Sequence, residues 1–217
     1  MNIILIAPPA AGKGTESEKL IKDYALAHIS TGDLLRKAIN DNTPLACEIN
    51  DCIAKGELVS DDIILKLIEN RILEDDCKKG YILDGFPRTI AQAEKYDEML
   101  EKNNLDAGYV FVIDIEKELA KSRIVGRRSC PKCGRVYNVS FEDSMPKVEN
   151  TCDDCKVELM RRKDDNEESF EKRFEVYLNE TAPLIDYYEK KNILYHINGN
   201  IDKEERHKQI KDIIENS

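Results

Sequence analysis

The sequence predicts an α/β fold in which helices flank a parallel β-sheet. Short apolar runs recur along the chain, segments with helical periodicity separate them, and a loop containing Gly12, Lys13 and Gly14 directly follows the first run. Strands that alternate with helices in this way are typical of parallel sheets. A chain of 217 residues is long enough for one large domain with inserted lobes.

Four apolar runs are the predicted strands, at residues 2–6, 81–83, 109–113 and 193–197. They lack the polar alternation of a half-exposed strand, which indicates burial on both faces. Helices are predicted where apolar residues recur on one face, one of them after the capping candidates Asp61 and Asp62. The apolar stripes are Ile63, Ile64, Leu67, Ile68 and Ile72; Phe170, Phe174, Tyr177 and Leu178; and Ile210, Ile213 and Ile214.

Two regions interrupt the alternation and predict inserted lobes. Residues 30–59 are typical of short helices with no strand, and residues 126–165 are rich in turns, cysteine and charge. The predicted core therefore consists of residues 1–29, 60–125 and 166–217.

The charge balance limits the classes of partner. There are 33 basic and 43 acidic residues, a net charge of −10, so the chain should repel nucleic acid and anionic lipid. A site for phosphates must then gather its basic side chains locally. No apolar run is long enough for a membrane span, and residues 2–11 lack the basic flank of a signal peptide. We therefore expect a cytoplasmic protein.

Residues 7–15 (APPAAGKGT) predict a phosphate-binding loop. Backbone N–H groups and the dipole of the following helix attract an anion there, Lys13 adds a positive charge, and Thr15 adds a hydroxyl. The alternative is an ordinary strand-to-helix turn that contains a lysine. The loop resembles the GxPGxGKGT pattern of nucleoside monophosphate kinases, with Ala7 and Ala10 in place of two glycines. Alanine tolerates positive φ poorly, but a methyl is small, so we expect the loop to tolerate both changes.

Further blocks resemble the adenylate kinase family, and their order extends the resemblance from residue 2 to about residue 200. They are residues 30–33 with Arg36, residues 56–59, residues 84–88 with Gln92, residues 126–128, residues 162–165, Arg173, and residues 181–184. The resemblance implies a P-loop-type core with a five-stranded parallel sheet, a helical AMP-binding lobe at residues 30–59 and a lid at residues 126–165. It also implies a monomer that catalyses the reversible, Mg²⁺-dependent reaction of ATP with AMP to give two ADP, in adenine nucleotide homeostasis and AMP salvage.

The resemblance also implies the site residues. The catalytic set is Lys13, Asp84, Arg88, Arg123, Arg127, Arg162 and Arg173. The ATP-binding set is Ala10, Ala11, Gly12, Lys13, Gly14, Thr15, Arg123, Arg127, Val136, Tyr137 and Ile201. The AMP-binding set is Thr31, Arg36, Glu57, Leu58, Val59, Gly85, Phe86, Pro87, Arg88, Gln92, Arg162 and Arg173.

Several of these residue types suit their implied roles. Asp84 ends a buried strand, where a carboxylate can hold Mg²⁺ through waters; helix capping is the alternative. The guanidinium forks of Arg36 and Arg88 match a phosphate, and Gln92 can pair with an adenine edge. Thr31 is also an N-cap candidate.

Exposed arginines often pair with surface carboxylates, which is the alternative for each arginine taken alone. Asp164 and Asp165 are interpreted as lid residues that order the arginines on closure. A phosphate oxygen of AMP is already ionised near neutral pH, so no general base is expected. His28, His196 and His207 lie outside the motif blocks.

Cys130, Cys133, Cys152 and Cys155 form two C-x₂-C pairs separated by 18 residues. This spacing predicts a closed, structural zinc site in the lid. Two disulfides or four free thiols are the alternatives, and iron is the alternative metal. Cys47, Cys52 and Cys77 lack such spacing and are expected to be unliganded.

Two competing functions remain at this point. One is a kinase for another monophosphate, such as UMP, CMP or GMP, against which the cysteine lid and Gln92 argue. The other is a non-enzymatic nucleotide sensor or zinc-ribbon adaptor, supported by Ala7 and Ala10 alone. Lys13, Asp84 and the arginine set argue against it.

Overall fold

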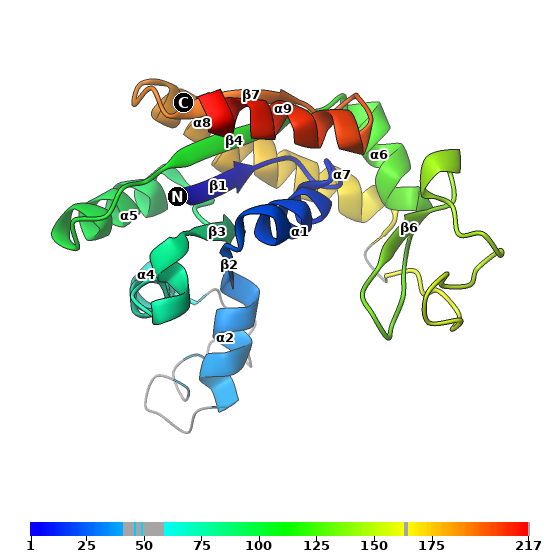
Figure 1. Ribbon diagram of the computed structural model, residues 1–217, viewed down its shortest axis with the longest axis horizontal. Helices are drawn as coiled ribbons and strands as arrows, with labels where there is room; N and C mark the ends of the chain where they lie inside the picture. Colours follow the sequence, from blue (N-terminus) through cyan, green and yellow to red (C-terminus); the bar gives the residue numbers. More distant parts are fainter. Residues whose placement is uncertain (41–45, 47–48, 50–58, 163–164, 217) are drawn as a thin grey trace.

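A computed structural model describes residues 1–40, 46, 49, 59–162 and 165–216 of the chain (Figure 1). Its centre is a five-stranded, fully parallel sheet with strand order β2-β3-β1-β4-β7. The strands are β1 (Asn2–Ile6), β2 (Ala27–Ser30), β3 (Tyr81–Asp84), β4 (Tyr109–Asp114) and β7 (Leu194–Asn198). This arrangement confirms the predicted α/β fold class and sheet.

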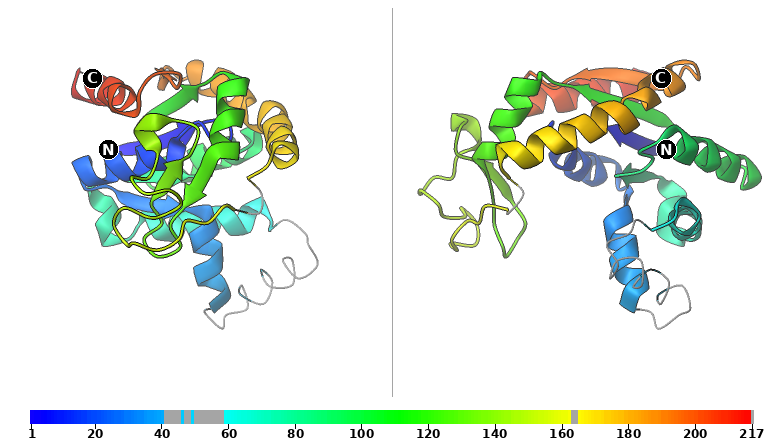
Figure 2. Two further views of the ribbon diagram at one scale, coloured as in Figure 1. Left: turned by 90° about the vertical axis from the view of Figure 1, so that its right-hand side faces the viewer. Right: turned by 180° about the vertical axis from the view of Figure 1, so that it is seen from behind.

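Helices cover both faces of the sheet, as the apolar strands require. The helices around the sheet are α1 (Lys13–Tyr24), α4 (Asp61–Ile72), α5 (Ile90–Lys102), α6 (Lys117–Gly126), α7 (Glu167–Val176), α8 (Pro183–Glu189) and α9 (Lys203–Asn216), with a 3₁₀ segment at Asp75–Lys79 and a π-helical turn at Tyr177–Thr181. Helices α1 and α9 lie together on one face in Figure 1, and the view from behind in Figure 2 shows α5, α6 and α7 on the other.

Alternate residues of β1 point into two separate apolar cores. Ile3 and Leu5 pack with Leu20 of α1 and Ile210 of α9, whereas Ile4 and the residues on its side pack against α4, α5 and α8. Each fully buried aliphatic side chain contributes about 1.5–3 kcal/mol relative to exposure. Burial on both faces therefore explains why the central strands β1, β3 and β4 are largely apolar.

Two parts of the chain extend away from this core (Figures 1 and 2). Helix α2 (Thr31–Asn40) projects from the end of β2. Strands β5 (Arg127–Ser129) and β6 (Val136–Asn138) form an antiparallel pair beyond α6, and a 3₁₀ turn at Glu142–Ser144 follows. Ser129 also bridges to Met160, which returns the chain to α7.

Three details differ from the expectations. Asp61 and Asp62 lie inside the first turn of α4, and Ser60 occupies the N-cap without a side-chain hydrogen bond. Leu178 is 52% exposed because the helical stripe passes into a π-turn at Tyr177. Strand β2 was not among the apolar runs, since exposed His28 separates buried Ala27 and Ile29. Among the described residues, no helix combines the length and apolarity that a membrane crossing needs.

Candidate active site

A cavity of about 1360 Å³ lies at the carboxyl ends of the central strands, between the sheet and the β5–β6 lobe. Residues 5–15 and 84–88 line it from the core, residues 133–138 and 141 line it from the lobe, and the start of α9 closes one side. Ligands of open α/β sheets bind at this edge because the loops that leave the strands converge there.

The predicted phosphate loop forms one wall of the cavity. Helix α1 begins at Lys13, and Gly12 is its N-cap with a φ of 96°, a left-handed conformation that glycine adopts without strain. No side chain caps the first turn, so its backbone N–H groups are not occupied by a capping oxygen. The dipole and N–H groups of a helix start attract a phosphate.

The two alanines in this loop differ in conformation. Ala10 has a φ of +63°, whereas Ala7 is not among the described residues with positive φ. Left-handed backbone costs a non-glycine residue about 1–2 kcal/mol. Ala10 packs against the apolar cluster of Ala120, Ile124 and Phe170, and this packing offsets part of the cost.

Asp84 ends β3 and contacts two basic groups. Its Oδ1 lies 2.5 Å from Nζ of Lys13, and its Oδ2 lies 3.5 Å from Nε2 of His28 on the neighbouring strand. The hydrogen bond with His28, and then the charge of Lys13, hold the pKa of Asp84 far below its usual range. The carboxylate is therefore ionised at neutral pH. His28 lies outside the motif blocks, but parallel pairing of Ser30 with Asp84 brings its strand to this carboxylate.

The loop after β3 is held by hydrogen bonds among the predicted AMP residues. Gly85 has a φ of 80°, and its carbonyl accepts from Nε of Arg88 at 2.8 Å and from the Thr31 hydroxyl at 3.5 Å. The Gln92 side chain accepts from the Arg88 backbone at 2.8 Å and donates to Asp61 at 2.7 Å. The amide of Gln92 is thus engaged within the protein, although it was expected to face an adenine.

Two of the lid-side arginines are partly buried. Arg127 donates through Nε to Asp165 at 2.9 Å and makes a second contact through its Nη2, and Asp165 is 1% exposed. Burial, and then the nearby charge of Arg206, lower the pKa of Arg123. Arg88, Arg162 and Arg173 are exposed and face the same cavity.

The cavity lining carries a net positive charge, although the net charge of the whole chain is negative. Eleven basic side chains and six acidic ones line it, an excess of five positive charges in a chain whose net charge is −10. Such a concentration of positive charge in a cleft attracts polyanions.

The seven predicted catalytic residues and the whole predicted ATP-binding set line this cavity, as do Gly85, Phe86 and Pro87. Thr31 and Gln92 lie behind the Gly85 loop, and Val59 packs in a small apolar cluster with Ala38 and Ile63. Glu57, Leu58, Asp164 and the side chain of Arg36 lie outside the described part of the chain, as do Cys47 and Cys52.

Sequence reasoning missed several residues of the cavity. Lys19, Lys172 and Arg206 line it, yet none belongs to a recognisable motif. Lys19 lies within α1, beyond the loop motif. Lys172 and Arg206 give no signal in their spacing, because α7 and α9 reach the site only through the sheet topology.

The four lid cysteines form a compact cluster. Their sulfur atoms all lie within 4.8 Å of one another, and Cys133 Sγ is 3.8 Å from Cys152 Sγ. Backbone N–H groups of Lys132 and Cys133 point to Cys130 Sγ, and the Tyr137 hydroxyl donates to Cys152 Sγ at 3.5 Å. The hydrogen bond from Tyr137 contributes most to lowering the pKa of Cys152 to about 6.

This cluster fits a tetrahedral zinc ion. With Zn–S bonds of about 2.3 Å, the sulfurs of a tetrahedron stand about 3.8 Å apart. The Cys133–Cys152 spacing of 3.8 Å matches that edge. Cys77 lies far from this group in the sequence, is buried, and contacts Arg71.

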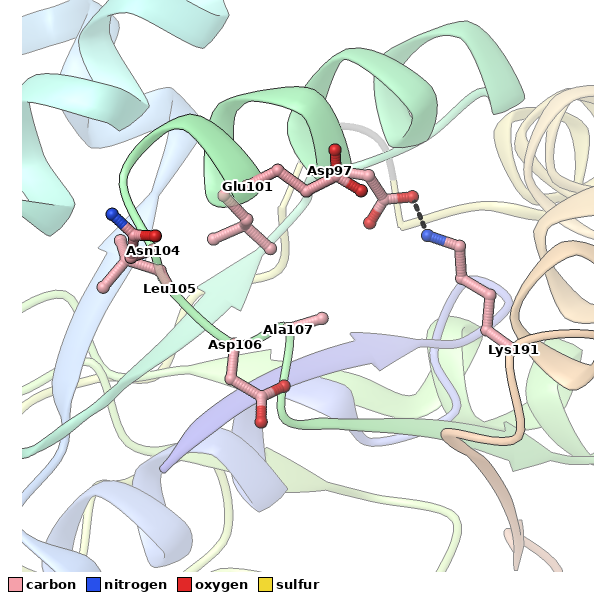
Figure 3. Close-up of a pocket in the computed structure, with 8 residues that line it drawn as sticks. Asp97, Glu101, Asn104, Leu105, Asp106, Ala107 and Lys191 are labelled. Carbon is pink, nitrogen blue, oxygen red and sulfur yellow. Dashed lines mark hydrogen bonds and ion pairs between the residues drawn. The ribbon is translucent and has the colours of Figure 1, made fainter.

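A second hollow, of about 430 Å³, lies beside the last turns of α5 and the loop that follows it (Figure 3). Asp97, Glu101 and Asp106 line it, and Lys191 turns to Asp97. Because three carboxylates and only one ammonium group line this hollow, its negative charge would repel a phosphate.

Comparisons with known proteins show which family the chain resembles. The family model described as "Adenylate kinase" matches residues 5–193. The chain is 42% identical over 214 residues to an adenylate kinase of Bacillus subtilis, covering 99% of this chain and 98% of that protein. It is 46% identical over 211 residues to an adenylate kinase of Caldanaerobacter subterraneus, covering 97% and 95%. The chain therefore belongs to the adenylate kinase family, whose members are phosphotransferases with a phosphate group as acceptor.

Proposed function

We propose that this protein binds ATP at the phosphate loop and AMP beside residues 85–88, and transfers the terminal phosphoryl group of ATP to AMP. The observation that carries the proposal is the cavity itself, in which the loop and Arg88 line one basic space. ATP and AMP, bound with their phosphate groups facing each other, bring most of their negative charge to that space. The product is two molecules of ADP, and the reaction is reversible.

On the ATP side, the first turn of α1 and Lys13 bind phosphate oxygens. Arg123 and Arg127 add positive charge from the end of α6 and the start of β5. The bidentate contact with Asp165 fixes the guanidinium plane of Arg127, so less side-chain freedom is lost when a phosphate binds. Val136, Tyr137 and Ile201 surround the nucleoside.

On the AMP side, Arg88 binds the phosphate, with Arg36 as a second fork. The carbonyl of Gly85 and the side chain of Gln92 orient the backbone and Nε of Arg88. Gln92 reads the adenine after exchanging its bond to Asp61, and Thr31 and residues 57–59 complete the pocket. Arg162 and Arg173 lie between the two nucleotides and stabilise the transferring group.

The phosphoryl transfer depends on the alignment of the two substrates and on positive charge around the transferring group, and it needs no proton transfer by a side chain. The attacking oxygen of AMP is ionised near neutral pH, so no side chain has to remove a proton. Holding the attacking and leaving oxygens in line, with guanidinium groups around the equatorial oxygens, supplies the rate enhancement. Closure of the lobes at residues 30–59 and 126–165 keeps water away from ATP.

Two metal ions fit the residues described. Asp84 is an ionised carboxylate that lines the cavity beside Lys13, and its oxygens suit Mg²⁺ through waters. Bound with ATP, Mg²⁺ neutralises part of the phosphate charge. Cys130, Cys133, Cys152 and Cys155 hold Zn²⁺, which is structural because four thiolates leave no open position.

We also place the enzyme in the cytoplasm as a monomer. The family resemblance and the acidic net charge support this assignment. Light scattering on the purified chain tests the oligomeric state.

The test of the function is coupled detection of ADP formed from ATP and each of AMP, UMP, CMP and GMP. AMP should be strongly preferred. Arg88→Ala should lower kcat by about 10²–10³-fold with an unchanged unfolding midpoint, because the side chain is exposed and contacts developing charge. Lys95→Ala on α5 is the matched control, since Lys95 pairs with exposed Asp62 outside the cavity. Near-normal turnover by Arg88→Ala would remove Arg88 from the site.

A further inference from the structure

A buried carboxylate lies in the first turn of the phosphate-binding helix. Glu16 of α1 is 0% exposed, and both of its described side-chain partners come from α9, near the other end of the chain. Arg206 donates through Nε to Oε2 of Glu16 at 3.1 Å, and Nδ1 of His207 lies 2.5 Å from Oε1. A buried carboxylate without such partners would carry a large desolvation cost.

Arg206 also touches the phosphate loop itself. A β-carbon built on Gly12 would lie 3.0 Å from Nη2 and 3.3 Å from Nη1 of Arg206, so the guanidinium packs directly over Gly12. Arg206 is 3% exposed and lines the large cavity. Its Nε is engaged by Glu16, while its two terminal nitrogens lie at the loop.

The charges explain why this contact matters. An uncompensated carboxylate in the first turn of α1 would repel the phosphates that the helix start attracts. Arg206, together with the contact from His207, compensates that charge locally. Its charge also acts on Arg123, whose pKa is lowered first by burial and then by Arg206. The pair of Glu16 and Arg206 thus leaves the ATP end of the cavity basic and limits movement of Gly12.

We infer that Arg206 is a positioning residue of the phosphate loop. It holds the loop at Gly12 and compensates the charge of Glu16. Helix α9 therefore contributes to the half of the site that binds ATP. The inference rests on the proposed function, because it assigns one half of the cavity to ATP. Glu16 and Arg206 lie 190 positions apart in the sequence, and neither belongs to a motif block.

The test compares Michaelis constants for the two substrates. Arg206→Met keeps the length of the side chain but removes its charge and fork. It should raise KM for ATP about tenfold, as a nearby unit charge of the wrong sign would, and leave KM for AMP within about twofold. Adding Glu16→Gln should recover the part of this loss that comes from the uncompensated charge, while the part that comes from the lost contact with Gly12 remains. Lys211→Met is the matched control, since Lys211 joins α9 to Asp23 of α1 at 3.1 Å without lining the cavity.

The outcomes separate the inference from the function. If the unaltered chain forms no ADP, the proposed function fails. If that chain is active and Arg206→Met lowers only the unfolding midpoint or kcat, with both KM values unchanged, the inference is overturned. Equal increases in both KM values, or no recovery by Glu16→Gln, also overturn it. Should Arg206→Met not fold, Arg206→Lys retains the charge without the fork, and a KM for ATP equal to that of the unaltered chain would contradict positioning at Gly12.

Discussion

The ammonium of Lys13 lies 2.5 Å from the carboxylate of Asp84, so the phosphate loop and the end of β3 meet in a single ion pair. Both side chains are about one quarter exposed, at 27% and 26%, and both line the cavity. The pair brings the proposed phosphate-binding cation and the proposed Mg²⁺ carboxylate side by side.

Lys13→Met should lower kcat by about 10²–10³-fold, because one preorganised charge at the transferring phosphate is removed. The fold should persist, since the side chain is partly exposed and Asp84 keeps its contact with His28. Lys22→Met, in the exposed last turn of the same helix, is the control and should leave kcat unchanged. Steady-state ADP formation measures both. A kcat for Lys13→Met within threefold of the control would remove Lys13 from the chemistry.

Restoring glycine at Ala7 and Ala10 tests the altered loop. The Ala10 change relieves about 1 kcal/mol of left-handed strain. It also loses a packed methyl worth about 0.8 kcal/mol and adds chain entropy to the unfolded state. These terms concern stability and nearly cancel. KM for ATP should change by less than about twofold, because a methyl is a small intrusion beside a phosphate. Ala25→Gly is matched, because exposed Ala25 has a φ of 52° away from the cavity. A tenfold fall in KM for ATP would mean that the alanines impair the site.

The lid cysteines should bind one zinc ion per chain. Cys152→Ser should lower the zinc content and the unfolding midpoint, because metal binding contributes folding free energy. Cys77→Ser should leave the zinc content unchanged, since Cys77 contacts Arg71. Metal analysis of protein purified without chelators, followed by calorimetry with and without chelator, makes the measurement. A full complement of zinc in Cys152→Ser would contradict the assignment.

The contacts of His196 predict that part of the free energy of unfolding depends on pH. Hydrogen bonds with Asp114 at 2.7 Å and then with Glu189 at 3.1 Å raise its pKa above the usual value. A raised histidine pKa contributes stability that is complete below the unfolded pKa, about 6.5, and is lost as pH rises through the folded pKa. The side chain is 50% exposed, so the contribution is below about 1 kcal/mol.

His196→Gln should remove this pH-dependent contribution to the free energy of unfolding. Urea unfolding of both proteins at several pH values gives the difference in stability, which should shrink as pH rises above about 6.5. A difference that stays constant with pH would show that the two ion pairs do not stabilise the fold.

The sequence was sufficient for the features that depend on local pattern. Strands β1, β3, β4 and β7, the loop around Lys13 and the paired cysteines could all be predicted, because each depends on neighbouring residues. Strand β2 escaped detection because four residues that alternate between buried and exposed give only a weak apolar signal.

Contacts between distant segments could not be predicted. Arg206 reaches Gly12 only because α1 and α9 lie on the same face of the sheet. His28 reaches Asp84 through the register of β2 and β3, and Gln92 meets Asp61 through the packing of α5 on α4. Each contact depends on a topology that single-residue patterns do not specify.

Phosphorus NMR of ATP, AMP and Mg²⁺ with the purified protein tests the central claim most directly. The proposed transfer predicts that the AMP and ATP resonances decline together while the resonances of ADP grow, without inorganic phosphate. Release of inorganic phosphate with AMP unchanged would contradict it, because the basic cavity would then activate water instead of positioning a second nucleotide.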